Sequence, residues 1–196
     1  HFHPEMQVLS VAHGGCNLRC LYCQNWQFSQ HSPEKTVAVH DFESEPVLAR
    51  ATGKGLGGIS FTYTEADYTP EFAGEFADLA EEHGLKRTLC TAGYINPAPF
   101  SELISHFDAV TITFKGPSEE FYREVCSGSL APVQRSMRVA RDSGVWLEVA
   151  TLIVPTLNDS PGDVERMAAW IYKNLGPDTP WHLERFQPQF QLRNLP

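Results

Sequence analysis

Three cysteines lie within eight residues near the start of the chain, at Cys16, Cys20 and Cys23. Thiolates this close in sequence are able to surround one metal centre, and soft sulfur ligands favour zinc, copper(I) or iron–sulfur clusters. An ordinary four-iron cluster takes four cysteine thiolates. Three local cysteines leave one iron of such a cluster without a protein ligand, and an open iron is a place where a small molecule can bind and react.

Two simpler explanations compete with a cluster. The first is a structural zinc site in which His13 joins the three thiolates, since three cysteines and one histidine are a known zinc ligand set. The second is a set of buried thiols without a metal, although three in so short a window rarely all serve packing. Cys90 and Cys126 lie far from these three in sequence, and we expect Cys90 to be a small buried hydrophobic side chain.

The composition places these cysteines in an ordinary globular protein. The length of 196 residues predicts one domain, 1–196, and the start at His1 without an initiator methionine suggests a trimmed fragment of a longer protein. The 15 basic and 24 acidic side chains argue against nucleic acid or an anionic membrane as a partner. No apolar stretch is long enough to span a bilayer. An odd, clustered set of five cysteines indicates a reducing compartment, so we expect a cytoplasmic protein.

Short apolar or β-branched runs recur along the chain and predict strands. Between them lie segments with helical spacing of apolar residues, with proline at first-turn positions and glycine where helices should stop. The predicted strands span residues 8–11, 58–63, 86–91, 109–114, 146–154 and 181–186. The predicted helical faces lie at 72–80, 133–140 and 164–171, with first-turn prolines at 70, 97 and 161 and terminal glycines at 84, 144 and 176.

Strands that alternate with helices predict an α/β fold with a parallel sheet. This order fits an open doubly wound sheet or a partial barrel, and spacing alone does not choose between them. In both architectures the active site lies at the carboxyl ends of the strands. We therefore expect the cysteine loop to converge with the residues that follow the other strands, namely Thr64, Glu65, Ala92, Gly93, Lys115, Gly116, Pro155, Gln187 and Pro188.

The cysteine spacing resembles the signature of a known superfamily. The pattern C-x-x-x-C-x-x-C, with Tyr22 just before the last cysteine and a strand just before the loop, is similar to that of the radical S-adenosylmethionine (SAM) enzymes. Further segments resemble the pyruvate formate-lyase activating enzyme-like group and, within it, the AmmeMemoRadiSam system radical SAM enzymes. The resemblance covers nearly the whole chain, including residues 16–26, 121–123, 157–159 and 176–182.

The resemblance implies a fold, two cofactors and a reaction. The fold would be a partial (βα)6 TIM-like barrel with parallel strands. Cys16, Cys20 and Cys23 would hold a [4Fe-4S] cluster, and SAM would chelate its fourth iron. Reductive cleavage of SAM would give a 5′-deoxyadenosyl radical that abstracts a hydrogen atom from a substrate, while the protein orients SAM and excludes water.

The resemblance also implies roles for residues at the strand ends. Glu65 would accept a hydrogen bond from the SAM ammonium, and Lys115 would meet the SAM carboxylate or an acidic substrate; these two are the candidate catalytic residues. The simpler explanation for both is a solvated side chain, and for Tyr22, placed near the adenine, it is packing. The candidate cofactor-binding residues are Tyr22, Asn25, Thr64, Glu65, Ala92, Thr113, Lys115 and Gln187.

Four strand-end segments depart from the resembled family. Thr64-Glu65-Ala66 replaces an expected Asn-Glu-Pro, and residues 91–94 replace Thr-Asn-Gly-Tyr. Residues 113–115 replace Asp-Leu-Lys, and residues 186–188 replace Phe-His-Pro. Because polar groups are lost at the predicted barrel mouth, we expect a changed pose of SAM or a changed substrate. The alternatives are a cleavage of SAM that forms methylthioadenosine, and a non-catalytic metal-binding scaffold.

The implied chemistry requires partners. An external one-electron donor of the flavodoxin or ferredoxin type is needed, and the substrate is a small molecule or a protein or peptide, between which the sequence does not choose. A thiol that relays a radical is a further hypothesis for Cys126. The histidines show no H-x-x-x-H spacing, so a second catalytic metal is not indicated.

Overall fold

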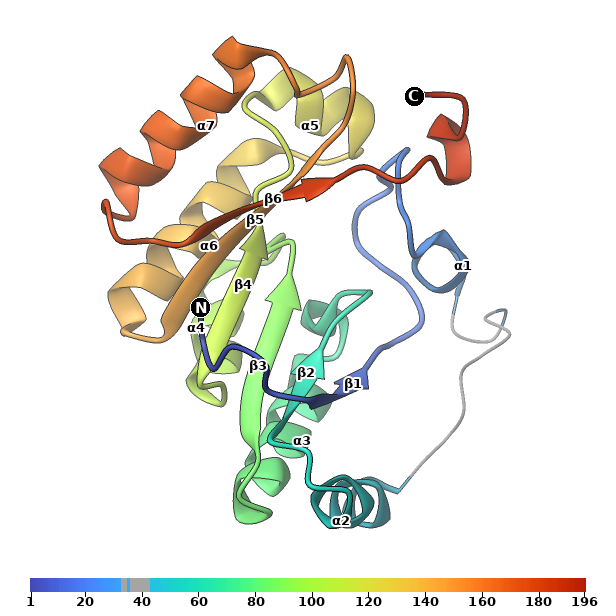
Figure 1. Ribbon diagram of the computed structural model, residues 1–196, viewed down its shortest axis with the longest axis vertical. Coiled ribbons are helices and arrows are strands. Elements are labelled where there is room, and N and C mark those ends of the chain that lie inside the picture. The colour runs from blue at the N-terminus through green and yellow to red at the C-terminus, as the bar shows by residue number, and fades with distance from the viewer. Residues whose placement is uncertain (33–34, 36–42) are drawn as a thin grey trace.

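The computed structural model describes residues 1–32, 35 and 43–196. Its strands form one parallel sheet in which each strand pairs with the next along the chain. The sheet curves into a partial (βα)6 barrel, which confirms the predicted fold (Figure 1). The strands are β1 (Val8–Val11), β2 (Gly58–Phe61), β3 (Lys86–Thr91), β4 (Ala109–Thr113), β5 (Trp146–Ile153) and β6 (Trp181–Arg185).

Helices connect the strands, and several begin and end at the predicted residues. Ser160 caps one of them by accepting a hydrogen bond from the Asp163 amide at 3.1 Å, and Gly144 ends another in a left-handed conformation with φ 81°. The helices are α1 (Trp26–Ser29), α2 (Ser44–Gly53), α3 (Pro70–Glu82), α4 (Pro97–Ser105), α5 (Glu119–Val125), α6 (Leu130–Ser143) and α7 (Pro161–Asn174), with short 3-10 turns η2 (Ala66–Tyr68) and η3 (Phe190–Leu192).

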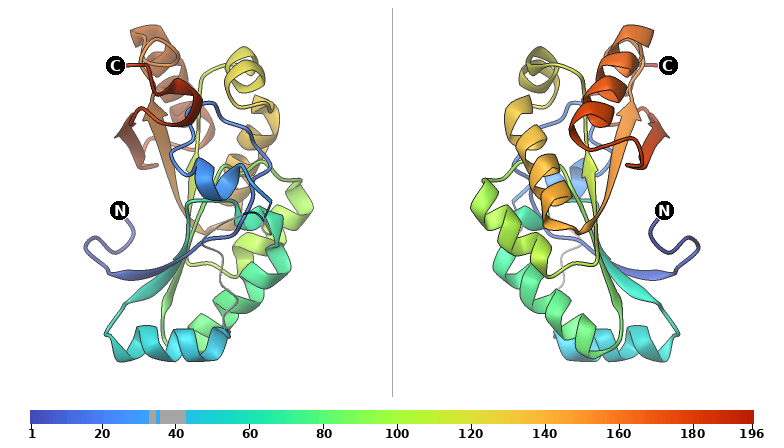
Figure 2. Two further views of the ribbon diagram at one scale, coloured as in Figure 1. Left: turned by 90° about the vertical axis from the view of Figure 1, so that its right-hand side faces the viewer. Right: turned by 90° about the vertical axis from the view of Figure 1, so that its left-hand side faces the viewer.

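One face of the sheet packs against the helices, and the other lines the barrel interior. Leu89, Val110, Ile112 and Val149 are fully buried and belong to the core beneath the helices, which cover the outer face of the sheet (Figure 2). Because successive side chains of a strand point to opposite faces, the residues between them point into the barrel. These inward residues, Cys90, Thr111, Thr113, Ala150 and Leu152, line an internal cavity.

Strand β2 is shorter than the sequence predicts, ending at Phe61 rather than at residue 63. Tyr63 takes a left-handed conformation with φ 68°, and the Thr64 amide donates to the Thr62 carbonyl at 2.8 Å. This tight turn ends the pairing with β3 and brings Glu65 into the barrel. Strands β4, β5 and β6 each end one residue before the predicted boundary.

Candidate cofactor site

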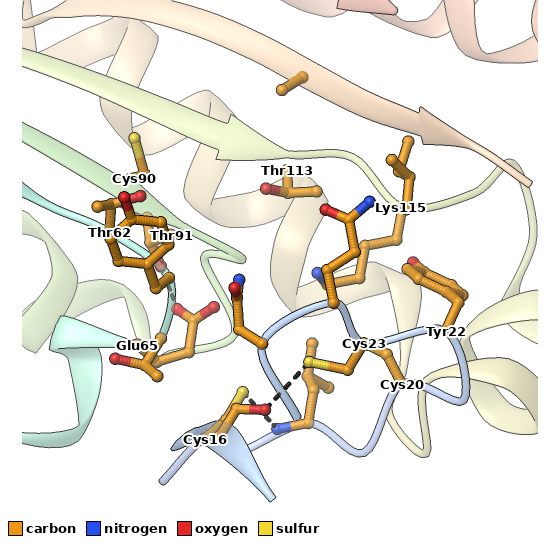
Figure 3. A pocket seen from close by; sticks show the side chains of 18 of the residues that line it. Cys16, Cys20, Tyr22, Cys23, Thr62, Glu65, Cys90, Thr91, Thr113 and Lys115 are labelled. Atoms are coloured by element: carbon orange, nitrogen blue, oxygen red, sulfur yellow. Dashed lines mark hydrogen bonds between the residues drawn. The ribbon is translucent and has the colours of Figure 1, made fainter. Parts of the chain in front are cut away.

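The cysteine loop and the strand ends meet in one cavity of about 250 Å³ at the carboxyl ends of the strands (Figure 3). All three thiols of the loop line this cavity, as do Glu65 and Lys115. The convergence predicted from the order of the elements is therefore present for Thr64, Glu65 and Lys115. The other strand-end residues of that prediction do not line this cavity, namely Ala92, Gly93, Gly116, Pro155, Gln187 and Pro188. Of the other predicted residues, Tyr22, Asn25 and Thr113 also line it.

Backbone hydrogen bonds hold the cysteine loop against the end of α5. The Arg19 amide donates to the Cys126 carbonyl at 2.9 Å, and the Leu21 amide donates to the Val125 carbonyl at the same distance. Leu18 is fully buried and anchors the loop in the core. On the cavity side, the Sγ of Cys23 lies 3.0 Å from the hydroxyl of Ser29. The end of α5 and the core thus hold the backbone of the loop, and its thiols face the cavity.

The spacing of the thiols fits a multi-iron cluster better than a single zinc ion. The Sγ atoms of Cys16, Cys20 and Cys23 do not all lie within 4.8 Å of one another in the described structure. Four ligands at about 2.3 Å from one zinc ion would have to be closer than that. His13, the alternative fourth ligand, has its Nδ1 2.6 Å from the Thr69 hydroxyl and its ring against Phe61. The Nε2 of His13 has no hydrogen-bond partner in the described part of the chain, so it is the spacing of the thiols that favours an iron–sulfur cluster over zinc.

Glu65 is buried at the centre of a hydrogen-bond network. The Thr91 hydroxyl donates to its Oε2 at 2.6 Å, and the Ala92 amide donates to its Oε1 at 2.9 Å. Burial raises the pKa of the Glu65 carboxyl, while the charge of Lys115 and these two hydrogen bonds oppose that rise. Ala92, predicted as a cofactor-binding residue, holds Glu65 through its backbone and does not line the cavity.

Asp67 adds a second acidic group beside Glu65, one that is not among the residues predicted from sequence. Its Oδ2 lies 3.0 Å from the Thr91 hydroxyl, and its buried Oδ1 has no hydrogen-bond partner in the described part of the chain. Burial, and then the charge of Glu65, raise the pKa of Asp67 to about 8. One hydroxyl proton cannot serve two carboxylates, and the raised pKa of Asp67 favours a protonated Asp67 beside an ionised Glu65 at neutral pH. The sequence signal that could have identified Asp67 as a site residue is its position two residues after Glu65.

Lys115 is positioned through its backbone. Its amide donates to the Tyr122 hydroxyl at 3.0 Å, and its carbonyl accepts a hydrogen bond from Asn158 at 2.9 Å. Burial lowers the pKa of the Lys115 ammonium, but Cys20, Cys126 and Glu65 together raise it above its usual value. Lys115 is therefore a cation whose backbone is fixed at the end of β4 and whose charge acts on the Glu65 carboxyl.

Comparison with known proteins identifies the family. The sequence model of the radical SAM superfamily matches residues 11–171. The chain belongs to the radical SAM superfamily. It is similar to an uncharacterized protein of Methanocaldococcus jannaschii, with 38% identity over 100% of this chain and 58% of that protein. It also resembles a pyruvate formate-lyase-activating enzyme of Clostridium pasteurianum, with 26% identity over 82% of this chain and 67% of that enzyme.

Solved radical SAM structures share the fold. SuiB of Streptococcus suis bound to S-adenosylmethionine superposes with a TM-score of 0.75 at 10% identity, over 97% of this chain and 43% of SuiB. Methylornithine synthase superposes with a TM-score of 0.71 at 16% identity, over 97% of this chain and 57% of the synthase. The chain spans little more than half the length of the curated relative from M. jannaschii. No helix in the described ranges is long and apolar enough to cross a membrane.

Of the remaining predicted residues of this radical SAM chain, Gln187 lies away from the cofactor cavity, whereas Thr64 and Tyr22 line it as expected. Gln187 is exposed and lines a separate cavity with Phe186. Thr64 accepts a hydrogen bond from the His13 amide at 2.9 Å, so its hydroxyl ties the cysteine loop to the end of β2. Tyr22 is buried, with its hydroxyl 3.8 Å from the Sγ of Cys126.

The two remaining cysteines differ in burial. Cys90, expected to be buried, is partly exposed and lines the cavity, because it lies on the inward face of β3. Cys126 is fully buried at the end of α5 and does not line the cavity. The radical relay through Cys126 stays a hypothesis, because Cys126 does not line the cavity although its thiol is hydrogen-bonded to that of Cys20.

Proposed function

We propose that the chain is the catalytic core of a radical SAM enzyme, with a four-iron cluster on Cys16, Cys20 and Cys23. The observation that carries this proposal is the placement of three thiols in one cavity with an anion, Glu65, and a cation, Lys115. When bound, the cluster and SAM supply a 5′-deoxyadenosyl radical for hydrogen abstraction. Burial raises the pKa of the Cys16 thiol to about 12, so iron binding must displace its proton.

The charged pair suits the amino-acid end of SAM. A carboxylate is the natural partner of the SAM ammonium, and an ammonium is the natural partner of the SAM carboxylate. Thr91 and Ala92 fix the orientation of Glu65, and Tyr122 and Asn158 fix the backbone of Lys115. The protein thus holds the Glu65 carboxylate in place before SAM binds, and it fixes the backbone from which the Lys115 side chain extends. Both features reduce the cost of ordering these groups on binding.

The substrate and the electron donor are proposed from the relatives. Pyruvate formate-lyase-activating enzymes support a protein or peptide substrate, and the changed strand ends keep a small molecule as the alternative. The reaction requires an external one-electron donor of the flavodoxin or ferredoxin type. The five cysteines, all within the described residues, form no disulfide, in keeping with the proposed reducing, cytoplasmic environment.

Nucleoside analysis tests the proposed reaction. The protein is reconstituted with iron and sulfide without oxygen, reduced, and mixed with SAM, and the products are separated by chromatography. We expect 5′-deoxyadenosine, and we expect Cys20→Ser to abolish it while Cys90→Ala keeps the iron content of the parent. Methylthioadenosine would show a different cleavage of SAM. A protein that takes up no iron and holds one tight zinc ion would overturn the proposal.

A further inference from the structure

A second group of metal-ligating side chains lies outside the cofactor cavity. His1, Glu148 and His182 place one ligand atom each within 4.8 Å of one another, and in the described part of the chain no other set of three or more does so. The Nε2 of His182 lies 2.5 Å from the Oε2 of Glu148, and the Nδ1 of His1 lies 3.8 Å from the same oxygen. The two imidazoles are stacked, with ring centroids 4.7 Å apart.

The carboxylate of this group is held in a fixed orientation. The Trp146 indole donates to the Oε1 of Glu148 at 2.8 Å, and the Phe2 amide donates to the same oxygen at 2.7 Å. The side chain of Glu148 is only 9% exposed. With Oε1 occupied by two donors, Oε2 is directed at both imidazoles. Partners that orient a ligating carboxylate in this way are a regular feature of protein metal sites.

The group lies at the amino ends of the strands, opposite the cofactor cavity. A second cavity of about 430 Å³ is lined there by residues 1–5 and by inward residues of β3, β4 and β5, including Glu148. Cys90 and Thr111 line both cavities, so the two cavities adjoin inside the barrel. The segment before β1 crosses this end of the barrel to reach β5 (Figure 1).

We propose that His1, Glu148 and His182 bind one divalent transition-metal ion, of the Zn²⁺ or Fe²⁺ class. Two imidazoles and one carboxylate are a ligand set that such ions accept, with further positions left for water. No second metal was expected from the sequence, because no two histidines lie one helical turn apart. These ligands come instead from the segment before β1, from β5 and from β6, so no local spacing indicates them.

The ion would join the two open edges of the barrel. β1 and β6 are the edge strands of the sheet, each with one strand neighbour. His1 precedes β1, and His182 lies on β6. A metal ion bound by both therefore links the edges at the amino ends of the strands, whereas the cysteine loop lies at the opposite ends. We expect metal binding to raise the melting temperature of the protein.

The test must separate this site from the cysteine site. The triple variant Cys16→Ser, Cys20→Ser, Cys23→Ser removes the cluster ligands, and the chain is purified without a histidine tag. We expect this variant to bind one Co²⁺ with visible absorption bands that Zn²⁺ abolishes, and to melt several degrees higher with the metal. His1→Ala should weaken Co²⁺ binding at least tenfold, whereas His3→Ala, a neighbouring exposed histidine, should not change it.

A parallel measurement keeps the test independent of the folding of the triple variant. The parent chain with its cluster reconstituted is equilibrated with Zn²⁺, and bound zinc is counted beside iron. One zinc per chain that is lost in His1→Ala supports the proposal, since His1 is an exposed residue whose removal leaves the core intact. No zinc in the parent, or equal zinc in His1→Ala and the parent, would overturn it. Failure of the cluster to form would concern the proposed function alone.

Discussion

At the scale of single residues, the site is governed by a shared proton. Glu65 and Asp67 both approach the Thr91 hydroxyl, at 2.6 and 3.0 Å, and that hydroxyl has one proton to donate. To bind the ammonium group of SAM as proposed, the Glu65 carboxyl has to be ionised. Asp67, with its pKa raised to about 8, keeps a proton and so spares Glu65 from a second negative charge.

The replacement Asp67→Asn tests this arrangement through the pH dependence of stability. In the unfolded chain Asp67 loses its proton near pH 4, and in the folded chain near pH 8. The folded state of the parent therefore binds more protons over this window, so the stabilisation from the protonated carboxyl is lost as the pH rises. An asparagine side chain does not titrate, and at about 1.4 kcal/mol per pH unit the variant should gain up to about 4 kcal/mol relative to the parent between pH 5 and pH 8.

Urea denaturation of both proteins across that pH range, in the same metal state, measures the difference. Asp178→Asn makes the same chemical change at an exposed site and is the control. A constant difference between Asp67→Asn and the parent at all pH values would show that Asp67 is ionised in the folded protein.

At the scale of elements, the approach of β2 to β3 sets the distance between Glu65 and Thr91. Gly58 at the start of β2 lies opposite Lys86, and a Cβ on Gly58 would lie 2.6 Å from the Lys86 carbonyl oxygen. Gly58→Ala must push the two strands apart and should lower the free energy of unfolding by about 2 kcal/mol.

The matched control is Gly53→Ala at the end of α2, where a Cβ meets no atom within 4 Å. Alanine is a better helix former than glycine, so this variant should be unchanged or up to about 1 kcal/mol more stable. The free energies are compared by chemical denaturation. Equal stability of the two variants would mean that the strands do not approach as closely as described.

The elements can be predicted from sequence wherever local patterns decide them. Most of the strands are predictable because they are short apolar or β-branched runs, and α3, α6 and α7 because each carries an apolar face over several turns. Helix α5 is not, because seven residues are too short to show periodicity. The end of β2 depends on the left-handed backbone of Tyr63, which no hydrophobic pattern reports.

The site is predictable to the same extent. The three cysteines can be found because their spacing is local. The Glu65–Thr91 bond joins residues 26 positions apart, and the Asn158–Lys115 bond joins residues 43 positions apart. Such partners become visible only when the strands are placed side by side, and the His1–Glu148–His182 group escapes prediction for the same reason.

At the scale of the whole molecule, the two proposed sites lie at opposite ends of one barrel interior. The cofactor cavity opens at the carboxyl ends of the strands, and the proposed metal site lies at their amino ends, with Cys90 and Thr111 between them. The central claim concerns the first of these. Cys16, Cys20 and Cys23 supply three thiolates, so a four-iron cluster on this loop must keep one iron free for SAM.

Mössbauer spectroscopy of the ⁵⁷Fe-reconstituted chain, before and after SAM is added, tests that claim most directly. We expect four irons per chain, one of which changes its spectrum when SAM binds while the other three keep theirs. Spectra of all four irons that stay unchanged when SAM is added, or a protein that holds a single zinc ion in place of iron, would contradict it.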